Sequence, residues 1–180
     1  AQYEENPYPR WIHTSHLTPK SVKDVLCAPP LSFKLDDYDA PQNPETLVAG
    51  CGTGQHAIQA AARFLNTKVT AVDLSLGSLS YALRKTREAG IENLESIQGD
   101  ILQLDKIDKQ FDMIECGGVL HHMADPLAGW KVLTGLLRDG GLMKIGLYSE
   151  KGRPDVVAAR KLIEEAGYGN SATEIRRCRQ

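Results

Sequence analysis

A glycine-rich turn between an apolar run and a helical pattern limits most strongly what this chain can fold into. Residues 47–49 (Leu-Val-Ala) lead into Gly-Cys-Gly-Thr-Gly at positions 50–54, and apolar residues then recur at helical spacing over 57–65. Glycine has no Cβ, so the backbone can approach a ligand closely, and the N-terminus of a helix offers unpaired N–H groups. The pattern predicts a strand, a turn and a helix that form a site for a nucleotide-like ligand.

Short β-rich runs alternate with helical patterns from residue 46 onward, which is typical of a parallel α/β sheet. We predict strands at 46–49, 68–72, 94–98, 111–116 and 141–148, and helices at 55–65, 76–89, 126–137 and 154–166. Residues 1–45 are rich in proline, and one short helix is expected there at Lys20–Leu26, with Thr18 as its N-cap. The expected organisation is an N-terminal arm or lid over residues 1–45 and one ligand-binding domain over residues 46–180.

Charge and cysteine content argue against several classes of protein. A net charge of −2 gives no general nucleic-acid footprint, and we interpret Arg176, Arg177 and Arg179 as a solvent-exposed helix face. The four cysteines form no CxxC pair, so neither a zinc site nor a redox motif is indicated. No signal-like segment opens the sequence, and no apolar run nears the roughly 18 residues of a membrane span. We therefore expect a cytoplasmic protein without a membrane partner.

Polar or glycine-rich residues follow each of the first four predicted strands, where ligands of open parallel sheets bind. Asp73 follows the second strand and suits ribose hydroxyls, or else serves the loop or caps the next helix. Asp100 follows the third strand and suits the exocyclic amine of adenine, with Ile101 against the ring, or else is a turn residue. Gly117 and Gly118 follow the fourth strand, and either let carbonyls approach a ligand amine or form a plain turn.

The spacing of the glycines separates the possible nucleotide ligands. A dinucleotide site has the pattern G-x-G-x-x-G, and here Gln55 stands where the third glycine should be. No Gly-Lys-Ser/Thr follows, so the turn is not a P-loop. The pattern favours a ligand that has adenosine at one end and an amino acid at the other.

These motifs together resemble the class I S-adenosylmethionine-dependent methyltransferases over about residues 46–150. The motifs that carry the resemblance lie at residues 48–54, 72–75, 98–101, 111–122 and 137–142. The resemblance implies a Rossmann-like, mostly parallel sheet with helices on both faces, S-adenosylmethionine as cofactor and S-adenosylhomocysteine as product. It also implies a C-terminal strand hairpin that residues 167–180 do not supply, so we expect the chain to be a fragment.

The resemblance also assigns the cofactor contacts. They lie at the ends of the first four strands, at Gly50, Cys51, Gly52, Gly54, Gln55, Asp73, Leu74, Ser75, Gly99, Asp100, Ile101, Cys116, Gly117 and Gly118. One position departs from the pattern. Members of the superfamily usually carry an acidic residue two positions before the first glycine, where it organises the methionine end of the cofactor, and here Val48 occupies that position.

Methyl transfer from a sulfonium mainly requires alignment of the acceptor, and a base is needed only if the acceptor is protonated or weak. His121 and His122 follow the fourth strand, near the expected methyl group, so His121 is the candidate base, with a capping or packing role as the alternative. No third ligand is spaced to join the two histidines in a metal site. Tyr3, Tyr8 and Trp11 suit a lid over cofactor or acceptor, or packing of the arm.

The sequence therefore predicts an S-adenosylmethionine-dependent methyltransferase that acts on a small molecule or a protein side chain. The opening residues 3–11 are similar to the methyltransferase domain of bacterial tetratricopeptide-repeat proteins, which implies flanking repeats of that kind. Two alternatives remain. One is a non-catalytic module that binds S-adenosylmethionine or S-adenosylhomocysteine, and the other is an NAD-dependent oxidoreductase, which would need the glycine that Gln55 replaces.

Overall fold

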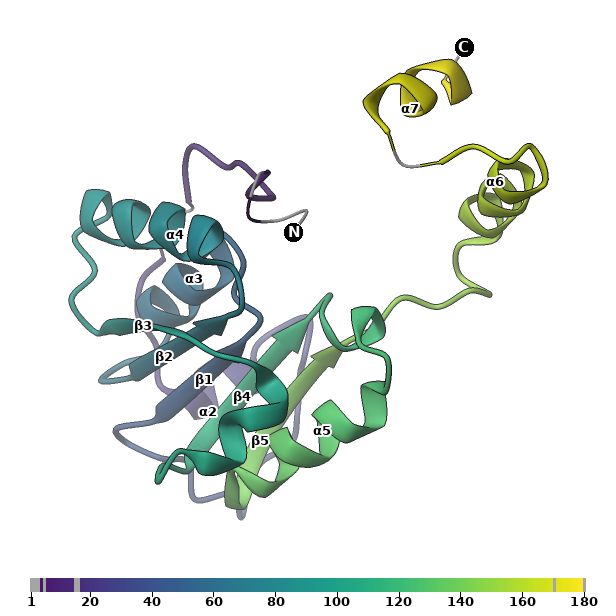
Figure 1. The fold of residues 1–180 in the computed structure, drawn as a ribbon. Helices are drawn as coiled ribbons and strands as arrows, with labels where there is room; N and C mark the ends of the chain where they lie inside the picture. The colour runs from purple at the N-terminus through teal and green to yellow at the C-terminus, as the bar shows by residue number, and fades with distance from the viewer. Residues whose placement is uncertain (1–3, 5, 15–16, 170, 180) are drawn as a thin grey trace. The chain divides into compact units, whose positions relative to one another are not determined.

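The computed structural model describes residues 4, 6–14, 17–169 and 171–179 (Figure 1). The contacts along the chain divide it into two units, Ala1–Gly146 and Leu147–Gln180. The first unit holds the sheet and the second holds two helices. The expected boundary near residue 46 stays a prediction.

Five parallel strands form a single sheet in the order β3-β2-β1-β4-β5. The strands are β1 (Glu45–Ala49), β2 (Lys68–Asp73), β3 (Leu94–Gln98), β4 (Phe111–Gly117) and β5 (Leu137–Gly146). The order reverses at β1, which pairs with β2 on one side and with β4 on the other. Ligands of such sheets bind outside the carboxyl ends of the strands at this reversal.

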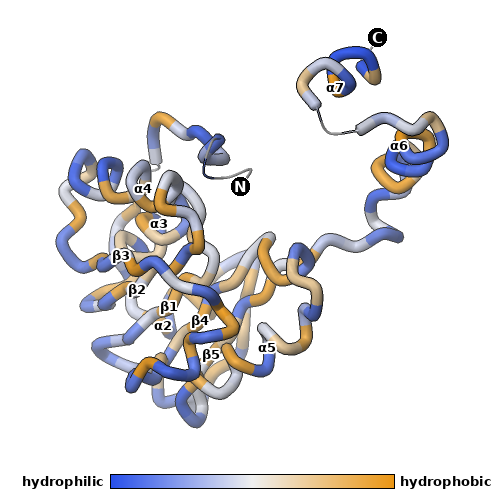
Figure 2. The backbone as a smooth tube through the Cα atoms, in the orientation of Figure 1, coloured by the Kyte–Doolittle hydropathy of each residue, from blue (hydrophilic) through white to orange (hydrophobic). Residues whose placement is uncertain are grey.

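Helices cover both faces of the sheet, which confirms the predicted Rossmann-like class (Figure 1). The first unit contains α2 (Val22–Cys27), α3 (Gln55–Arg63), α4 (Leu76–Glu88), α5 (Pro126–Gly135) and the 3₁₀ helices η1 (Ile101–Lys106) and η2 (Leu120–His122). Val48 packs on the face that α3 and α4 cover, whereas Leu47 and Ala49 pack toward η1, η2 and α5. The middle strands β1 and β4 are largely hydrophobic, as Figure 2 shows, because both of their faces are covered.

Two expected boundaries were wrong. Helix α2 begins at Val22 and its N-cap is Ser21, whose Oγ accepts a hydrogen bond from Asp24 N at 3.1 Å. Lys20 cannot join the helix because its backbone forms a parallel bridge with Phe64. Strand β5 begins at Leu137 rather than at residue 141, although its pairing with β4 is irregular between Leu137 and Leu142.

The second unit contains α6 (Pro154–Glu165) and α7 (Ala172–Cys178). Helix α7 was not predicted, although Ser171 and Glu174 have the spacing of a capping box and the Ser171 hydroxyl accepts from Glu174 N at 3.2 Å. Arg176 and Arg177 lie exposed on α7, as expected. The described residues from 147 onward contain no strand. Nowhere in the described chain does a helix reach the length and apolar character needed to cross a membrane.

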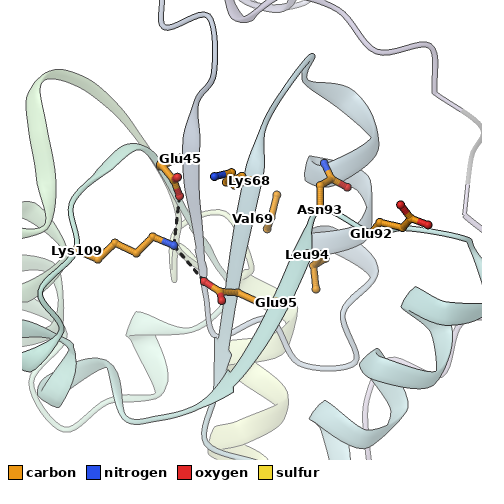
Figure 3. Close-up of a pocket in the computed structure, with 8 residues that line it drawn as sticks. All are labelled: Glu45, Lys68, Val69, Glu92, Asn93, Leu94, Glu95 and Lys109. Atoms are coloured by element: carbon orange, nitrogen blue, oxygen red, sulfur yellow. Dashed lines mark hydrogen bonds and ion pairs between the residues drawn. The ribbon is translucent and has the colours of Figure 1, made fainter.

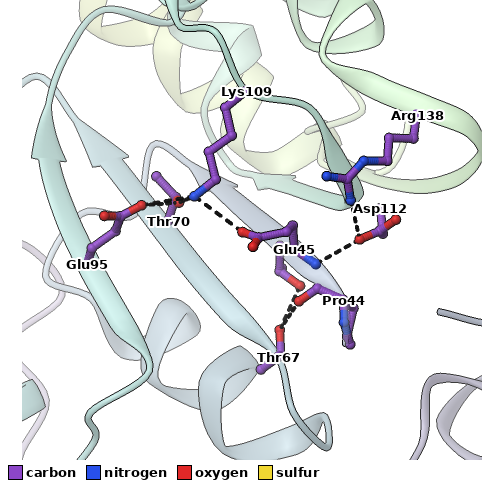
Figure 4. A network of polar contacts seen from close by, with 9 residues as sticks. Pro44, Glu45, Thr67, Thr70, Glu95, Lys109, Asp112 and Arg138 are labelled. Carbon is purple, nitrogen blue, oxygen red and sulfur yellow. Dashed lines mark hydrogen bonds and ion pairs between the residues drawn. The ribbon is translucent and has the colours of Figure 1, made fainter. Parts of the chain in front are cut away.

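A charged groove lies at the amino ends of β1, β2 and β3, at the opposite ends of the strands from the glycine turn (Figure 3). Lys109, just before β4, spans this groove. Its Nζ lies 3.2 Å from Glu45 Oε2 on β1 and 3.1 Å from Glu95 Oε1 on β3, and it donates to Thr70 Oγ1 on β2 at 2.9 Å (Figure 4). Hydrogen bonds with the two glutamates outweigh the effect of burial and raise the pKa of Lys109. Lys109 therefore ties three strands together.

We expect Lys109→Met to lower the free energy of unfolding by about 1 kcal/mol, because the half-buried Glu45 loses its cation while the apolar stem is retained. Urea denaturation at low and high salt measures the loss, which should shrink as salt screens the charges. Lys106→Met, at an exposed position in η1, is the matched control. Equal stability of the two variants would show that the groove charges do not hold the strands.

Candidate functional site

The glycine turn has left-handed backbone at Gly50, Gly52 and Gly54, with φ of +72°, +53° and +83°. A Cβ on Gly50 would lie 2.4 Å from Val119 Cγ2, and one on Gly54 would lie 2.5 Å from Ala82 Cβ. These two glycines thus allow the turn to pack closely against the segment after β4 and against α4. The nearest atom to a Cβ on Gly52 would be the Tyr8 carbonyl oxygen at 3.4 Å.

Asp73 ties the end of β2 to the glycine turn. Its Oδ2 accepts a hydrogen bond from Gly52 N at 2.7 Å, and its Oδ1 accepts one from Ser75 N at 2.9 Å. The cap of α4 is Ser75, whose Oγ accepts from Ser78 N at 3.0 Å, so Asp73 does not cap that helix. The side chain of Leu74 is exposed beside them. The structure thus brings together Asp73 and the glycine turn, which the sequence placed at neighbouring strand ends.

The end of β3 joins the same edge of the sheet, because Gly99 N donates to Asp73 O at 3.0 Å. Asp100 is the N-cap of η1, and its Oδ1 accepts from Leu102 N at 2.9 Å. Ile101 is buried in the core cluster that also contains Val72. Asp100 thus caps η1 through one oxygen, and recognition of adenine by its other oxygen stays a prediction.

The two glycines at the end of β4 have open space around them. A Cβ on Gly117 or Gly118 would meet no atom of the described residues within 4 Å, and Gly118 has a φ of +77°. Such an opening suits the approach of a ligand. Gly118 N donates to Gly146 O at 2.9 Å, which holds this turn to the end of β5.

Two candidate contacts, Cys51 and Cys116, are buried thiols. Burial, with a smaller contribution from the charge of Asp73, raises the pKa of Cys51 to about 12, and burial raises the pKa of Cys116 to about 11. Both thiols stay protonated at neutral pH, so they serve as small packing residues rather than as nucleophiles.

The N-terminal arm packs on the glycine turn and on α4. The Trp11 indole N–H donates to Thr53 O at 3.1 Å, and the Thr53 hydroxyl donates to Pro9 O at 2.6 Å. The Glu4 carboxylate accepts from the first N–H groups of α4, Leu76 N at 2.8 Å and Gly77 N at 3.0 Å. These two backbone bonds outweigh desolvation and lower the pKa of Glu4.

The three aromatic residues proposed for a lid have different surroundings. Trp11 is only 8% exposed, whereas the side chain of Tyr8 is 70% exposed. Tyr3 lies outside the described residues. Trp11 thus anchors the arm, and Tyr8 leaves an aromatic ring open beside the turn.

The two histidines after β4 lie in η2. Their ring centroids are 4.2 Å apart, and His121 is half-buried while His122 is exposed. The preceding Leu120 is fully buried, so it fixes this short helix to the core below α5. Among the described residues, no group of three or more histidines, cysteines or carboxylates is arranged to hold a metal ion.

Sequence reasoning missed a contact between a histidine and a buried carboxylate at the start of α3. Glu115 on β4 is 6% exposed, and its carboxylate contacts the Nε2 atom of His56 in the first turn of α3. Arg63 and Lys144 lie farther away, at 3.8 Å and 3.9 Å. Only the packing of α3 on the sheet reveals this pair, because 58 residues separate His56 from Glu115 and give no local signal.

Comparison with models of protein families identifies the family of this chain. Residues 47–141, more than half of the chain, match the family model described as a methyltransferase domain. The chain belongs to this family. The resemblance to the class I S-adenosylmethionine-dependent superfamily is thereby confirmed, together with its fold.

Three relatives show how far the similarity extends. An uncharacterized protein of Synechococcus sp. is 35% identical over 127 residues, which cover 69% of this chain and 30% of that protein. Demethylmenaquinone methyltransferase of Staphylococcus aureus is 29% identical over 110 residues, covering 61% of this chain and 45% of that enzyme. The crystal structure of an S-adenosylmethionine-dependent methyltransferase from Clostridium acetobutylicum is 28% identical, with a TM-score of 0.51, and covers 56% of this chain and 41% of that one. The chain thus spans less than half the length of these relatives.

Proposed function

We propose that this methyltransferase-family protein binds S-adenosylmethionine at the carboxyl ends of β1–β4 and transfers its methyl group to a small-molecule or protein acceptor. The observation that carries the proposal is the link between Asp73 and Gly52, which fixes a carboxylate at the middle of a glycine turn. The family match and the similarity to a methyltransferase of known structure support it.

Each end of the cofactor has a counterpart among the chain's residues. Among the described residues, Asp73 Oδ2 accepts from Gly52 N and Asp73 Oδ1 accepts from Ser75 N, so lone pairs on both oxygens are left for ribose hydroxyls. We propose Asp100 and Ile101, at the neighbouring strand end, as the contacts of adenine. The N-terminus of α3 follows Gly54, which has no side chain to cap it, so its N–H groups suit the carboxylate of a methionine. The open backbone of Gly117 and Gly118 suits the amine.

When bound, the cofactor supplies a methyl group on a positively charged sulfur, which is already a good leaving group. The chain's residues then have to orient the acceptor and exclude water, and orientation alone contributes roughly 7–11 kcal/mol in favourable cases. Tyr8 is the proposed lid residue, on an arm that Trp11 anchors. His121 is the proposed base, and it matters only for an acceptor that carries a proton.

Calorimetry and a methyl-release assay test the proposal. We expect S-adenosylhomocysteine to bind with a micromolar dissociation constant and NAD not to bind, because Gln55 occupies the position of the third dinucleotide glycine. Methyl release with a panel of small-molecule and protein acceptors then separates an enzyme from a non-catalytic binding module. Binding of NAD in preference to S-adenosylhomocysteine would overturn the proposal. His121→Gln and His122→Gln in the same assay identify the histidine that takes a proton.

For the acceptor we propose these two classes, a small molecule or a protein. We also propose a cytoplasmic location and flanking tetratricopeptide repeats. The similarity to demethylmenaquinone methyltransferase makes a quinol-like small molecule a useful member of the acceptor panel. A chain that binds S-adenosylhomocysteine yet releases no methyl group with any acceptor would favour the binding module.

A further inference from the structure

The carboxylate of Glu115 lies on the face of the sheet that is covered by α3, the helix that follows the glycine turn. Its neighbours Ile114 and Cys116 pack in the core cluster with η1 and α5, so the side chain of Glu115 points to the opposite face, toward α3. Glu115 is the register partner of Val48 on β1. The two side chains therefore share one face and lie on neighbouring strands.

Glu115 is buried but its partners are accessible. It faces His56 and Arg63 of α3 and Lys144 of β5, whose side chains are 32%, 30% and 66% exposed. Burial alone would raise the pKa of Glu115, but the hydrogen bond from His56 and the charges of His56, Lys144 and Arg63 outweigh burial and lower it. Glu115 is therefore ionised at neutral pH. Such a buried charge is weak evidence for a stabilising role, because desolvation opposes the attraction.

The pair acts at the start of α3. His56 is the second residue of this helix, and the helix follows directly on Gly54. A contact that joins His56 to the buried strand β4 restrains the direction in which the first N–H groups of α3 point. Val48 is the position where the superfamily usually carries an acid, and the register places the carboxylate of Glu115 on the adjacent strand instead.

We propose that Glu115, acting through His56, positions the turn that receives the amino-acid end of S-adenosylmethionine. The acid that does this then comes from β4, whereas the superfamily pattern places it on β1. This inference rests on the proposed function. Glu115 acts as a positioning residue, because its carboxylate contacts His56. The adenosine end depends instead on Asp73 and Asp100, which lie at the ends of β2 and β3.

Two ligands separate the two ends of the site. S-adenosylhomocysteine carries the amino-acid group, whereas 5′-methylthioadenosine has the same adenosine without it. Glu115→Gln keeps the size of the side chain and removes its charge. We expect this variant to bind S-adenosylhomocysteine about tenfold more weakly and 5′-methylthioadenosine within about twofold of the unchanged chain, because charge-assisted contacts are worth about a factor of ten. Isothermal titration calorimetry measures both.

A second variant separates a positioning role from a folding defect of Glu115→Gln. His56→Gln, at a partly exposed position, should give the same ligand-selective loss, and the double variant should lose no more than either single one because both remove one contact. Lys131→Gln is the control, because Lys131 is exposed on α5, so affinity should change by less than about twofold.

The outcomes distinguish the two proposals. Failure of the unchanged chain to bind either ligand would overturn the proposed function. If the unchanged chain binds both ligands, two results would overturn the positioning role alone. In the first, Glu115→Gln and His56→Gln leave both affinities unchanged, and in the second they weaken the binding of both ligands equally. A merely structural role predicts the equal loss, so the selective loss supports positioning.

Discussion

Asp73→Ala is expected to weaken the binding of S-adenosylhomocysteine by about a hundredfold, which corresponds to about 3 kcal/mol for a carboxylate that serves two hydroxyls. The loss has a second source. Without the carboxylate, Gly52 N and Ser75 N lose their acceptor, so the middle of the glycine turn and the start of α4 are no longer tied together. Calorimetry with purified protein measures the effect.

The two ligands used for Glu115 also test whether Asp73 binds the ribose. Both S-adenosylhomocysteine and 5′-methylthioadenosine contain ribose, so Asp73→Ala should weaken both to a similar extent. Asp105→Ala, at an exposed carboxylate in η1, is the matched control and should change neither affinity. If Asp73→Ala binds S-adenosylhomocysteine within about threefold of the unchanged chain, Asp73 does not hold the ribose.

Local sequence signals were enough for the sheet and for the position of the glycine turn. The five predicted strands and four main helices exist because the inner strands are short apolar runs and apolar residues of the helices recur at helical spacing. Ser75 begins α4 as its N-cap, and Gly90 follows its end. The neighbourhood of Asp73 and Gly52 also followed from the sequence, because carboxyl ends of adjacent parallel strands share one edge.

Features that depend on distant residues could not be predicted. Thr18 has the chemistry of an N-cap, but the bridge between Lys20 and Phe64 moves the start of α2 to Val22. Trp11 was expected near the site, but nothing local indicates that its indole binds the Thr53 carbonyl. Each case requires knowledge of which segments meet in the fold.

The pair of Glu115 and His56 is the clearest example of this limit. In the sequence, Glu115 is one of two acidic residues in the predicted strand 111–116, and Val48 stands where an acid is expected. The strand register changes that view, because it places a buried carboxylate beside Val48 on the same face. Helix α7 is a different kind of miss, since its capping residues Ser171 and Glu174 were visible in the sequence.

Gly50→Ala is expected to cost about 3–4 kcal/mol of folding stability, which is among the larger effects for a single methyl group. The left-handed backbone at φ +72° contributes roughly 1–2 kcal/mol of this for a residue with a Cβ. The rest comes from overlap, because the new Cβ would lie 2.4 Å and 2.7 Å from the two γ-methyl groups of Val119, and overpacking costs about 1–3 kcal/mol. Urea denaturation gives the free energy of unfolding.

The two contributions can be separated by removing the atoms that clash. Val119→Ala deletes both γ-methyl groups, so Gly50→Ala combined with Val119→Ala should lose only the backbone part, roughly 1–2 kcal/mol, relative to Val119→Ala alone. Gly117→Ala is the comparison, because its Cβ would enter open space among the described residues. If the double variant is as unstable as the sum of the single ones, Val119 does not close over the turn. The expected coupling would instead show that the segment after β4, which carries the two histidines, is held against the first glycine of the turn.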